Sequence, residues 1–383
     1  MKKSLPFSPP SYSEKELSAV SECIKNSWTG SGPKVKKFEK NFKEYKKSLF
    51  SAAFSSCTST IFLALKALGI KEGDQVITSS MTFCSTVNAI IHCGAEPILC
   101  DIDEKTKNIS VNEIEKKINF KTKAIIPVHY AGYPCEMDQI MNIARENDIY
   151  IVEDCAHAIE STFRGKPCGT FGEIGCFSFY ATKNIAIGEG GMAISNHEKL
   201  ISDMTIMGLH GMSKDAWKRF TESQRKSYDV VKIGYKMNMT DIQASIGDVQ
   251  LSRIDEMRER RKEIWNFYTN NLKETSLELP NLPDDDSSIH ALHLYAVGLP
   301  KGIDKDEFMW IANNKYGINF GTHYTAIPSF TVYKSMFGNI NLMNEFPNAI
   351  NWGKKTVSLS LSAAVKDEDC ERIVNCIKEL TQY

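Results

Sequence analysis

The chain has 383 residues, with 46 Lys and Arg against 47 Asp and Glu, and a hydrophobic fraction of 42%. These values exclude a disordered tail and a small disulfide-stapled scaffold, and a chain of this length has room for about two or three domains. The net charge of -1 gives no general attraction to nucleic acid or to an acidic membrane. No secretory leader is recognisable and no apolar run reaches the ~18 residues of a membrane helix, so we expect reduced cysteines and a cytoplasmic protein without membrane contact.

The first predicted helix, residues 34–47, carries seven lysines. Val35, Phe38, Phe42 and Tyr45 recur in it at helical spacing, which predicts an amphipathic helix whose lysines form the solvent side. No aromatic platform or nucleic-acid motif accompanies the charge. We therefore expect no nucleic-acid partner.

Short apolar runs alternate with helix-like stretches between about residues 50 and 200. This alternation is typical of an α/β fold with a mainly parallel sheet, in which ligands bind at the strand ends. The runs predict strands at 75–78, 97–100, 124–128, 149–152 and 176–179, and the stretches between them predict helices at 60–68, 83–92 and 137–147.

The pattern of the sequence changes after about residue 240. A long charged helix is predicted over 240–271, followed by a connection rich in Pro and Asp. A strand at 292–297 and helices at 305–315 and 367–380 then predict a smaller α+β unit. We expect an N-terminal arm and large α/β domain over residues 1–245, and a connecting helix and small C-terminal domain over 246–383.

Several common chemical motifs are missing. There is no Cys-x-x-Cys pair and no His-Glu-x-x-His, so no metal site is predicted. The segment Gly188-Glu189-Gly190-Gly191 has neither phosphate-loop nor dinucleotide-binding spacing, and by itself indicates only a turn.

Polar and aromatic side chains at the predicted strand ends match what pyridoxal phosphate (PLP) needs. Lys183 offers the amine for a Schiff base, Asp154 a carboxylate for the pyridine nitrogen, and Thr58-Ser59 hydroxyls and amides for the phosphate at a helix start. Taken singly, each has an ordinary structural explanation: a loop lysine faces solvent, an Asp after a strand caps a helix, and a Phe such as Phe83 lies in the core. The argument therefore depends on their order and spacing.

Three segments resemble the DegT/DnrJ/StrS family of PLP-dependent sugar aminotransferases: Glu153–Ala158, Phe177–Asn184 and Gly188–Met192. Gly234–Asp241 matches as well, and the likeness extends over nearly the whole chain. The resemblance implies the aspartate aminotransferase fold (PLP fold type I), with a mainly parallel seven-stranded sheet in the large domain.

The resemblance also implies roles around the cofactor ring. Lys183 would be the catalytic residue, which holds PLP as a Schiff base and moves the proton between substrate carbon and cofactor. Asp154 would pair with the pyridine nitrogen, Phe83 would cover one ring face, and His157 would lie near the phenolic oxygen.

For the phosphate, the family pattern points to Thr58, Ser59 and Ser178, with Asn238 reaching in from a neighbouring subunit. A homodimer with its active site at the interface would then be the active unit.

The implied reaction takes the amino group of L-glutamate, releases 2-oxoglutarate, and places the amine on a nucleotide-linked keto-sugar, commonly a 4-keto-6-deoxyhexose. The product would enter glycan or lipopolysaccharide synthesis. The chain departs from the family's pattern after its His-Tyr pair, so the sugar stays open. Candidate substrate contacts by position are Trp28, Thr29, Gly30, His323 and Tyr324; the last two are equally well explained as buried packing residues.

Other functions remain open at this stage. Some family members carry His where Lys183 stands and act as sugar dehydratases. A different PLP enzyme of the same fold, or a non-catalytic regulatory homologue, are further alternatives. The presence of both Lys183 and Asp154 favours a transaminase.

Overall fold

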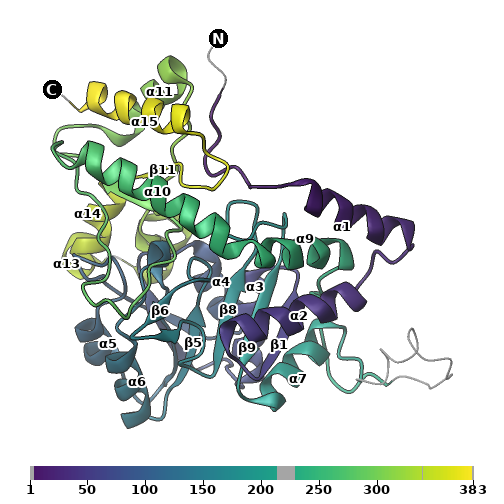
Figure 1. The fold of residues 1–383 in the computed structure, drawn as a ribbon. Coiled ribbons are helices and arrows are strands. Elements are labelled where there is room, and N and C mark those ends of the chain that lie inside the picture. The colour runs from purple at the N-terminus through teal and green to yellow at the C-terminus, as the bar shows by residue number, and fades with distance from the viewer. Residues whose placement is uncertain (1–3, 214–228, 339, 382–383) are drawn as a thin grey trace.

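A single mixed sheet lies at the centre of the computed structural model, in which residues 4–213, 229–338 and 340–381 are described (Figure 1). Neighbouring strands are parallel except for β9, which is antiparallel to both of its neighbours, so the predicted mainly parallel sheet is confirmed. The strand order is β1 (Phe50–Phe54), β9 (Gly191–Ser195), β8 (Ile174–Ser178), β5 (Tyr150–Asp154), β4 (Thr122–Ile126), β2 (Gln75–Ser79) and β3 (Glu96–Cys100).

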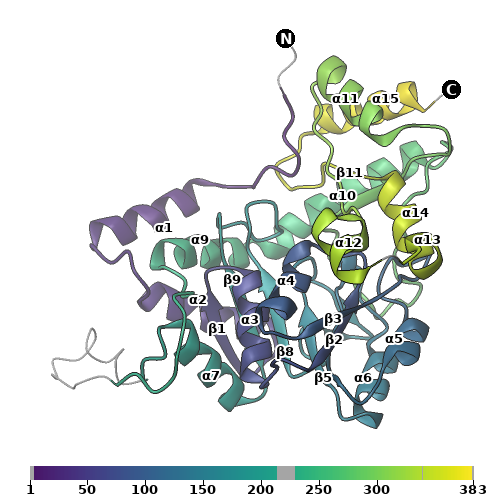
Figure 2. The same cartoon turned by 180° about the vertical axis from the view of Figure 1, so that it is seen from behind.

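Helices cover both faces of this sheet, because its strands bury apolar side chains on both sides. Val76 of β2 packs into the cluster formed with α3 (Cys57–Ala67), α4 (Cys84–His92) and α7 (Glu198–Gly208). Ile77, the next residue, packs on the opposite face. That face is covered by α2 (Pro33–Lys46), α5 (Val111–Lys117), α6 (Met137–Glu146) and α9 (Asp241–Ser252), whereas Figure 2 shows α3 and α4 in front of the sheet.

Helix α2 has the predicted amphipathic pattern, with Val35, Phe38 and Phe42 buried. Lys46 is an exception, since it is only 1% exposed. Its amine donates to the carbonyl of Ile159 at 2.7 Å and lies 5.1 Å from the centre of the Phe177 ring. The prediction that all the lysines form the solvent side is therefore wrong at Lys46, because a carbonyl and an aromatic face take the place of water.

The predicted long helix over 240–271 is two helices, α9 and α10 (Ile254–Leu272). A capping box of Thr240 and Gln243 begins α9. The break falls at Arg253, whose backbone leaves the helical region at φ -110° and ψ 6°. The guanidinium of Arg253 forms an ion pair with Glu16 of α1 (Glu14–Lys25) at 2.8 Å. The spacing of apolar residues along a helix cannot predict an ion pair between residues so far apart in the sequence.

The C-terminal segment forms a second buried cluster, built on α10 and joined by Leu5 of the N-terminal arm. The cluster includes residues of the two-stranded sheet of β10 (Tyr295–Gly298) and β11 (Thr356–Leu359) and of helices α11 (Lys305–Tyr316) and α15 (Asp367–Leu380). Helices α12 (Thr331–Phe337), α13 (Leu342–Glu345) and α14 (Pro347–Lys355) pack instead in a cluster with Met81, Val87 and Tyr130. The domain boundary between residues 245 and 246 stays a prediction. Among the described residues, no helix combines the length and apolarity needed to cross a membrane.

Candidate active site

A cavity of about 470 Å³ opens at one edge of the sheet. Strands β1, β2, β5 and β8 all end at this edge and β9 begins there, since β9 runs against its two neighbours. Polar side chains that follow these strands therefore converge, as is usual in open α/β sheets. The lining includes Ser56, Cys57, Thr58, Thr82, Phe83, Asp154, His157, Ser178, Tyr180, Lys183, Gly190, His323 and Tyr324.

Lys183 lies in the loop between β8 and β9. Its backbone amide donates to the carbonyl of Tyr180 at 2.8 Å, and the loop closes where the Ile187 amide donates to Phe179 at 3.0 Å. Burial lowers the pKa of the Lys183 amine to about 8. Within the described residues no hydrogen bond holds this amine, so it is free to react in the cavity.

Asp154 ends β5 and is 4% exposed. The amide of Ala156 donates to its Oδ1 at 3.1 Å, and the hydroxyl of Thr86 donates to its Oδ2 at 2.8 Å. Burial raises the pKa of this carboxyl, and these two donors oppose that shift. Thr86 was not among the residues predicted from the sequence; it lies in the first turn of α4, which begins at Cys84.

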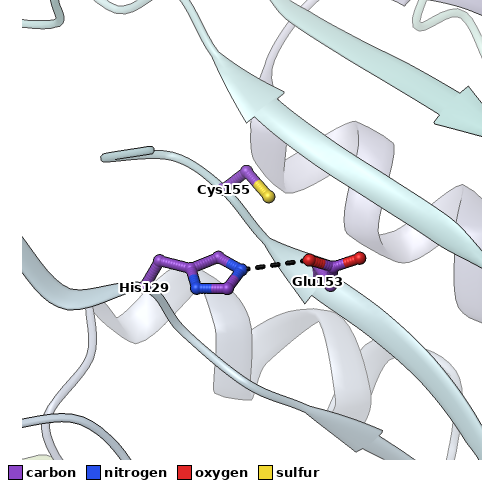
Figure 3. A group of neighbouring side chains, drawn as sticks. All are labelled: His129, Glu153 and Cys155. Carbon is purple, nitrogen blue, oxygen red and sulfur yellow. Dashed lines mark hydrogen bonds and ion pairs between the residues drawn. The ribbon is translucent and has the colours of Figure 1, made fainter. Parts of the chain in front are cut away.

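Glu153 and Cys155, which flank Asp154, do not line the cavity, and their side chains lie beside His129 (Figure 3). The ligand atoms of His129, Glu153 and Cys155 lie within 4.8 Å of one another. However, Glu153 already accepts the amides of Gly169, Phe171 and Gly172 and bonds His129 Nε2 at 3.1 Å. Both carboxylate oxygens are thus engaged, and the cluster anchors the end of β5 that carries Asp154.

The start of α3 offers an anion cradle. Ser56 caps the helix by accepting the amide of Ser59 at 3.0 Å, which leaves the amides of Cys57 and Thr58 without an intrahelical partner. The helix dipole adds partial positive charge at this end. Thr58 and Ser178 line the cavity here, whereas the hydroxyl of Ser59 lies within reach of Ser55 and Ser56, at 3.0 and 2.8 Å.

His157 and Tyr324 form a hydrogen-bonded pair in the wall of the cavity. The amide of Ala131 donates to Nδ1 of His157 at 3.2 Å, so this nitrogen carries a lone pair and the proton of the neutral ring is on Nε2. Burial lowers the pKa of His157 well below its usual value, in agreement with a neutral ring. Nε2 then donates to Tyr324 Oη at 2.8 Å, which leaves the phenolic proton free to donate to a ligand.

Comparison with known proteins shows the family of this chain. The model of the DegT/DnrJ/EryC1/StrS aminotransferase family matches residues 10–378. The chain belongs to this family. It is 39% identical over 382 residues to the spore coat polysaccharide biosynthesis protein SpsC of Bacillus subtilis, which covers 99% of this chain and 97% of SpsC.

Solved structures of the family agree in fold. Spr1654 from Streptococcus pneumoniae, a sugar aminotransferase by its name, superposes with a TM-score of 0.90 at 31% identity, over 99% of this chain and 98% of its own in its pyridoxamine phosphate (PMP) form. It has also been solved in its PLP form. The aminotransferase TlmJ from Streptoalloteichus hindustanus gives a TM-score of 0.89 at 30% identity, over 98% of each chain. The present chain is a PLP-dependent aminotransferase of fold type I.

The cavity of this aminotransferase fits PLP on its own geometry. The ring of Phe83 is 57% exposed although it is apolar, so a flat ligand ring has a surface to cover. The unpaired amine of Lys183, the buried carboxyl of Asp154 and the open amides at the start of α3 complete a set of partners for the aldehyde, the pyridine nitrogen and the phosphate.

Five of the predicted site residues lie outside this cavity: Ser59 of α3, and the group of Trp28, Thr29, Gly30 and Asn238. Asn238 instead donates from Nδ2 to the Ser31 hydroxyl at 2.5 Å, and Gly30 accepts the amide of Asp241 at 2.8 Å. The residues of this group in the aminotransferase therefore form one neighbourhood beside the end of β1, where Asn238 pairs with Phe54. Their roles remain predictions.

Proposed function

We propose that this enzyme moves the amino group of L-glutamate to the keto group of a nucleotide-linked sugar, a 4-keto-6-deoxyhexose, in cytoplasmic amino-sugar synthesis for a glycan or lipopolysaccharide. The observation that carries the proposal is the meeting of Lys183 and Asp154 in one cavity. The printed names of SpsC, which concern polysaccharide biosynthesis, and of Spr1654, which concern sugars, support a sugar substrate.

When bound, PLP supplies an electron sink for the negative charge that develops on the substrate carbon. Asp154 would pair with the protonated pyridine nitrogen by a charge-assisted hydrogen bond. Lys183 would hold the cofactor through its amine, and the same amine would carry the proton to and from the substrate carbon. Its lowered pKa of about 8 leaves a useful fraction of neutral amine near neutral pH.

The remaining side chains orient the reactants. Thr58, Ser178 and the amides at the start of α3 would bind the phosphate, and Phe83 would cover one face of the pyridine ring. Tyr324, with its phenolic proton directed away from His157, donates to an oxygen of the substrate or cofactor. His323 is held by Ser358 at 2.9 Å and lines the cavity, and we assign it to the sugar.

A homodimer would bring the remaining predicted residues into use. Asn238 and Gly30 lie outside the cavity of their own subunit, and the bond from Asn238 to Ser31 ties them into one unit. In a two-fold dimer this unit would face the phosphate and the sugar of the neighbouring site. We therefore assign Asn238 to the phosphate, and Trp28, Thr29 and Gly30 to the sugar, of the second subunit.

The first test is the absorbance of the purified protein with PLP, before and after L-glutamate, beside a Lys183→Ala variant. We expect a visible band from the lysine-bound cofactor, which moves to the near ultraviolet when glutamate converts it to the PMP form. The variant lacks the lysine amine and should not form the visible band. A screen of nucleotide-linked keto-sugars against the PMP form then identifies the acceptor.

Two outcomes would contradict the proposal. A cofactor band that is unchanged by glutamate would exclude glutamate as donor, and loss of a hydroxyl from the sugar without transfer of nitrogen would indicate a dehydratase. Equal spectra for the wild type and Lys183→Ala would exclude Lys183 as the cofactor lysine.

A further inference from the structure

Two buried threonine hydroxyls form a chain of hydrogen bonds that ends at Asp154, from Thr82 in the cavity wall to Thr86, which does not line the cavity. Thr86 Oγ1 donates to Asp154 Oδ2 at 2.8 Å, and the hydroxyls of Thr82 and Thr86 lie 2.9 Å apart. A hydroxyl has one proton, which Thr86 gives to the carboxylate, so Thr82 must be the donor in the second bond. The chain therefore runs in one direction, from Thr82 through Thr86 to Asp154, and all three side chains are buried.

We propose that Thr86, supported by Thr82, is a positioning residue that fixes the rotation of the Asp154 carboxylate toward the pyridine nitrogen of the bound cofactor. This inference rests on the role of Asp154 under the proposed function. Thr86 contacts neither the cavity nor the reacting atoms, and acts only through Asp154.

The placement of Thr86 gives the contact a geometric role. Without the hydroxyl of Thr86, the carboxylate of Asp154 would be held at one oxygen only, by the hydrogen bond from the amide of Ala156. The carboxylate would then be free to rotate about this hydrogen bond. Thr86 is on α4, the helix whose N-cap is Phe83. The start of α4 thus positions two groups: the ring of Phe83, which would cover one face of the cofactor, and the hydroxyl of Thr86, which would align Asp154 with the pyridine nitrogen.

The same contact favours the charged carboxylate. Burial raises the pKa of Asp154, and the amide of Ala156 and the hydroxyl of Thr86 lower it. Among the other groups near it, Lys183 is the one that carries positive charge, since His129 accepts the amide of Cys135 on Nδ1 and is neutral in this tautomer. The titratable groups facing the carboxylate are Lys183, His129, Cys57, Cys176 and Tyr324.

The test compares Thr86→Val, which keeps the shape and removes the hydroxyl, with Thr86→Ser, which keeps the hydroxyl. PLP affinity of each apo protein is measured by fluorescence titration between pH 5 and 9. In Thr86→Val the carboxyl of Asp154 loses the hydroxyl that donates to it, so it protonates at a higher pH. As the pH falls, it would therefore stop pairing with the pyridinium at a higher pH than in the wild type. We expect the acid limb of the affinity profile to move up by about one pH unit, with Kd about fivefold weaker at the wild-type midpoint and about tenfold weaker well below it.

Thr86→Ser should restore the wild-type profile, and Thr82→Val should give a smaller shift in the same direction, because Thr86 still donates to Asp154. A structural role alone would weaken binding equally at every pH. If Thr86→Val does not fold, Thr86→Ala, which adds no methyl group beside Asp154, takes its place.

The inference is overturned if the Val and Ala variants keep the wild-type pH profile, or if Ser does not restore it. This result can be separated from the fate of the proposed function. Wild-type protein that reacts with glutamate while Thr86→Val keeps an unshifted profile would overturn the inference alone. Wild-type protein inert to glutamate whose PLP affinity still depends on Thr86 would overturn the proposed function alone.

Discussion

The single residue with the most direct chemical consequence is Lys183, whose amine has a pKa lowered to about 8 by burial. Burial disfavours the ammonium form, so the amine loses its proton well below the pH at which an exposed lysine does. Only the neutral amine attacks the aldehyde of PLP. The rate of PLP capture by the apo protein should therefore rise with pH and level off above about pH 8.

The check is a stopped-flow measurement of capture between pH 6 and 10, with N-α-acetyl-lysine as the control amine in the same buffers. The free amine shows the pH dependence of the aldehyde itself and of an ordinary ammonium group, so the ratio of the two rates isolates Lys183. A ratio that does not depend on pH would show that Lys183 titrates as an exposed lysine does.

At the scale of elements, the phosphate cradle depends on how closely β9 approaches the start of α3. A Cβ on Gly191 would lie 2.4 Å from the Ser56 carbonyl group and 2.6 Å from the amide nitrogen of Cys57. Both are backbone atoms of the helix start, so α3 would have to move. We expect Gly191→Ala to weaken PLP binding by about tenfold or more, measured by fluorescence titration.

Gly247→Ala is the matched control, because its Cβ would meet the ring of Phe38 at 2.7 Å, on the face of the sheet opposite to α3. It should lower the unfolding midpoint while PLP affinity stays within about twofold of wild type. Equal losses of affinity in both variants would mean that general packing strain, and not the cradle, weakens binding.

Elements whose pattern is local could be predicted from the sequence. The helices that begin at Lys305 and Asp367 start where their apolar period and acidic first turns predict. Strands β1 and β9 were not predicted, since Phe50–Phe54 and Gly191–Ser195 contain small residues and acquire strand structure by pairing, β1 with β9 and β9 also with β8. The break at Arg253 was missed because the bond to Glu16 joins residues 237 positions apart.

The same distinction applies to the whole molecule. The sequence predicts Lys183, Asp154 and Phe83 because each lies at the end of a strand or in the loop after one. The topology of the sheet then brings these strand ends to one edge. Thr86 was missed because its contact with Asp154 spans 68 positions and depends on how α4 packs. The role of Asn238 is harder still to predict, because we assign it to the phosphate that is bound in another copy of the chain.

A shared active site can be tested on the assembled molecule by complementation. Lys183→Ala removes the cofactor amine and Asn238→Ala removes the phosphate contact that we assign to the opposite subunit. Each homodimer should be at least about tenfold less active at limiting PLP. After the two are unfolded together and refolded as a mixture, half of the dimers are mixed, and each mixed dimer has one site with both residues intact. Activity should then return to about a quarter of the wild-type value.

If Asn238 acts on its own subunit, no site in the mixture regains both residues, and activity should stay at the mean of the two variants. Light scattering of each sample establishes that dimers have formed, so a failure to assemble is not read as a failure to share the site.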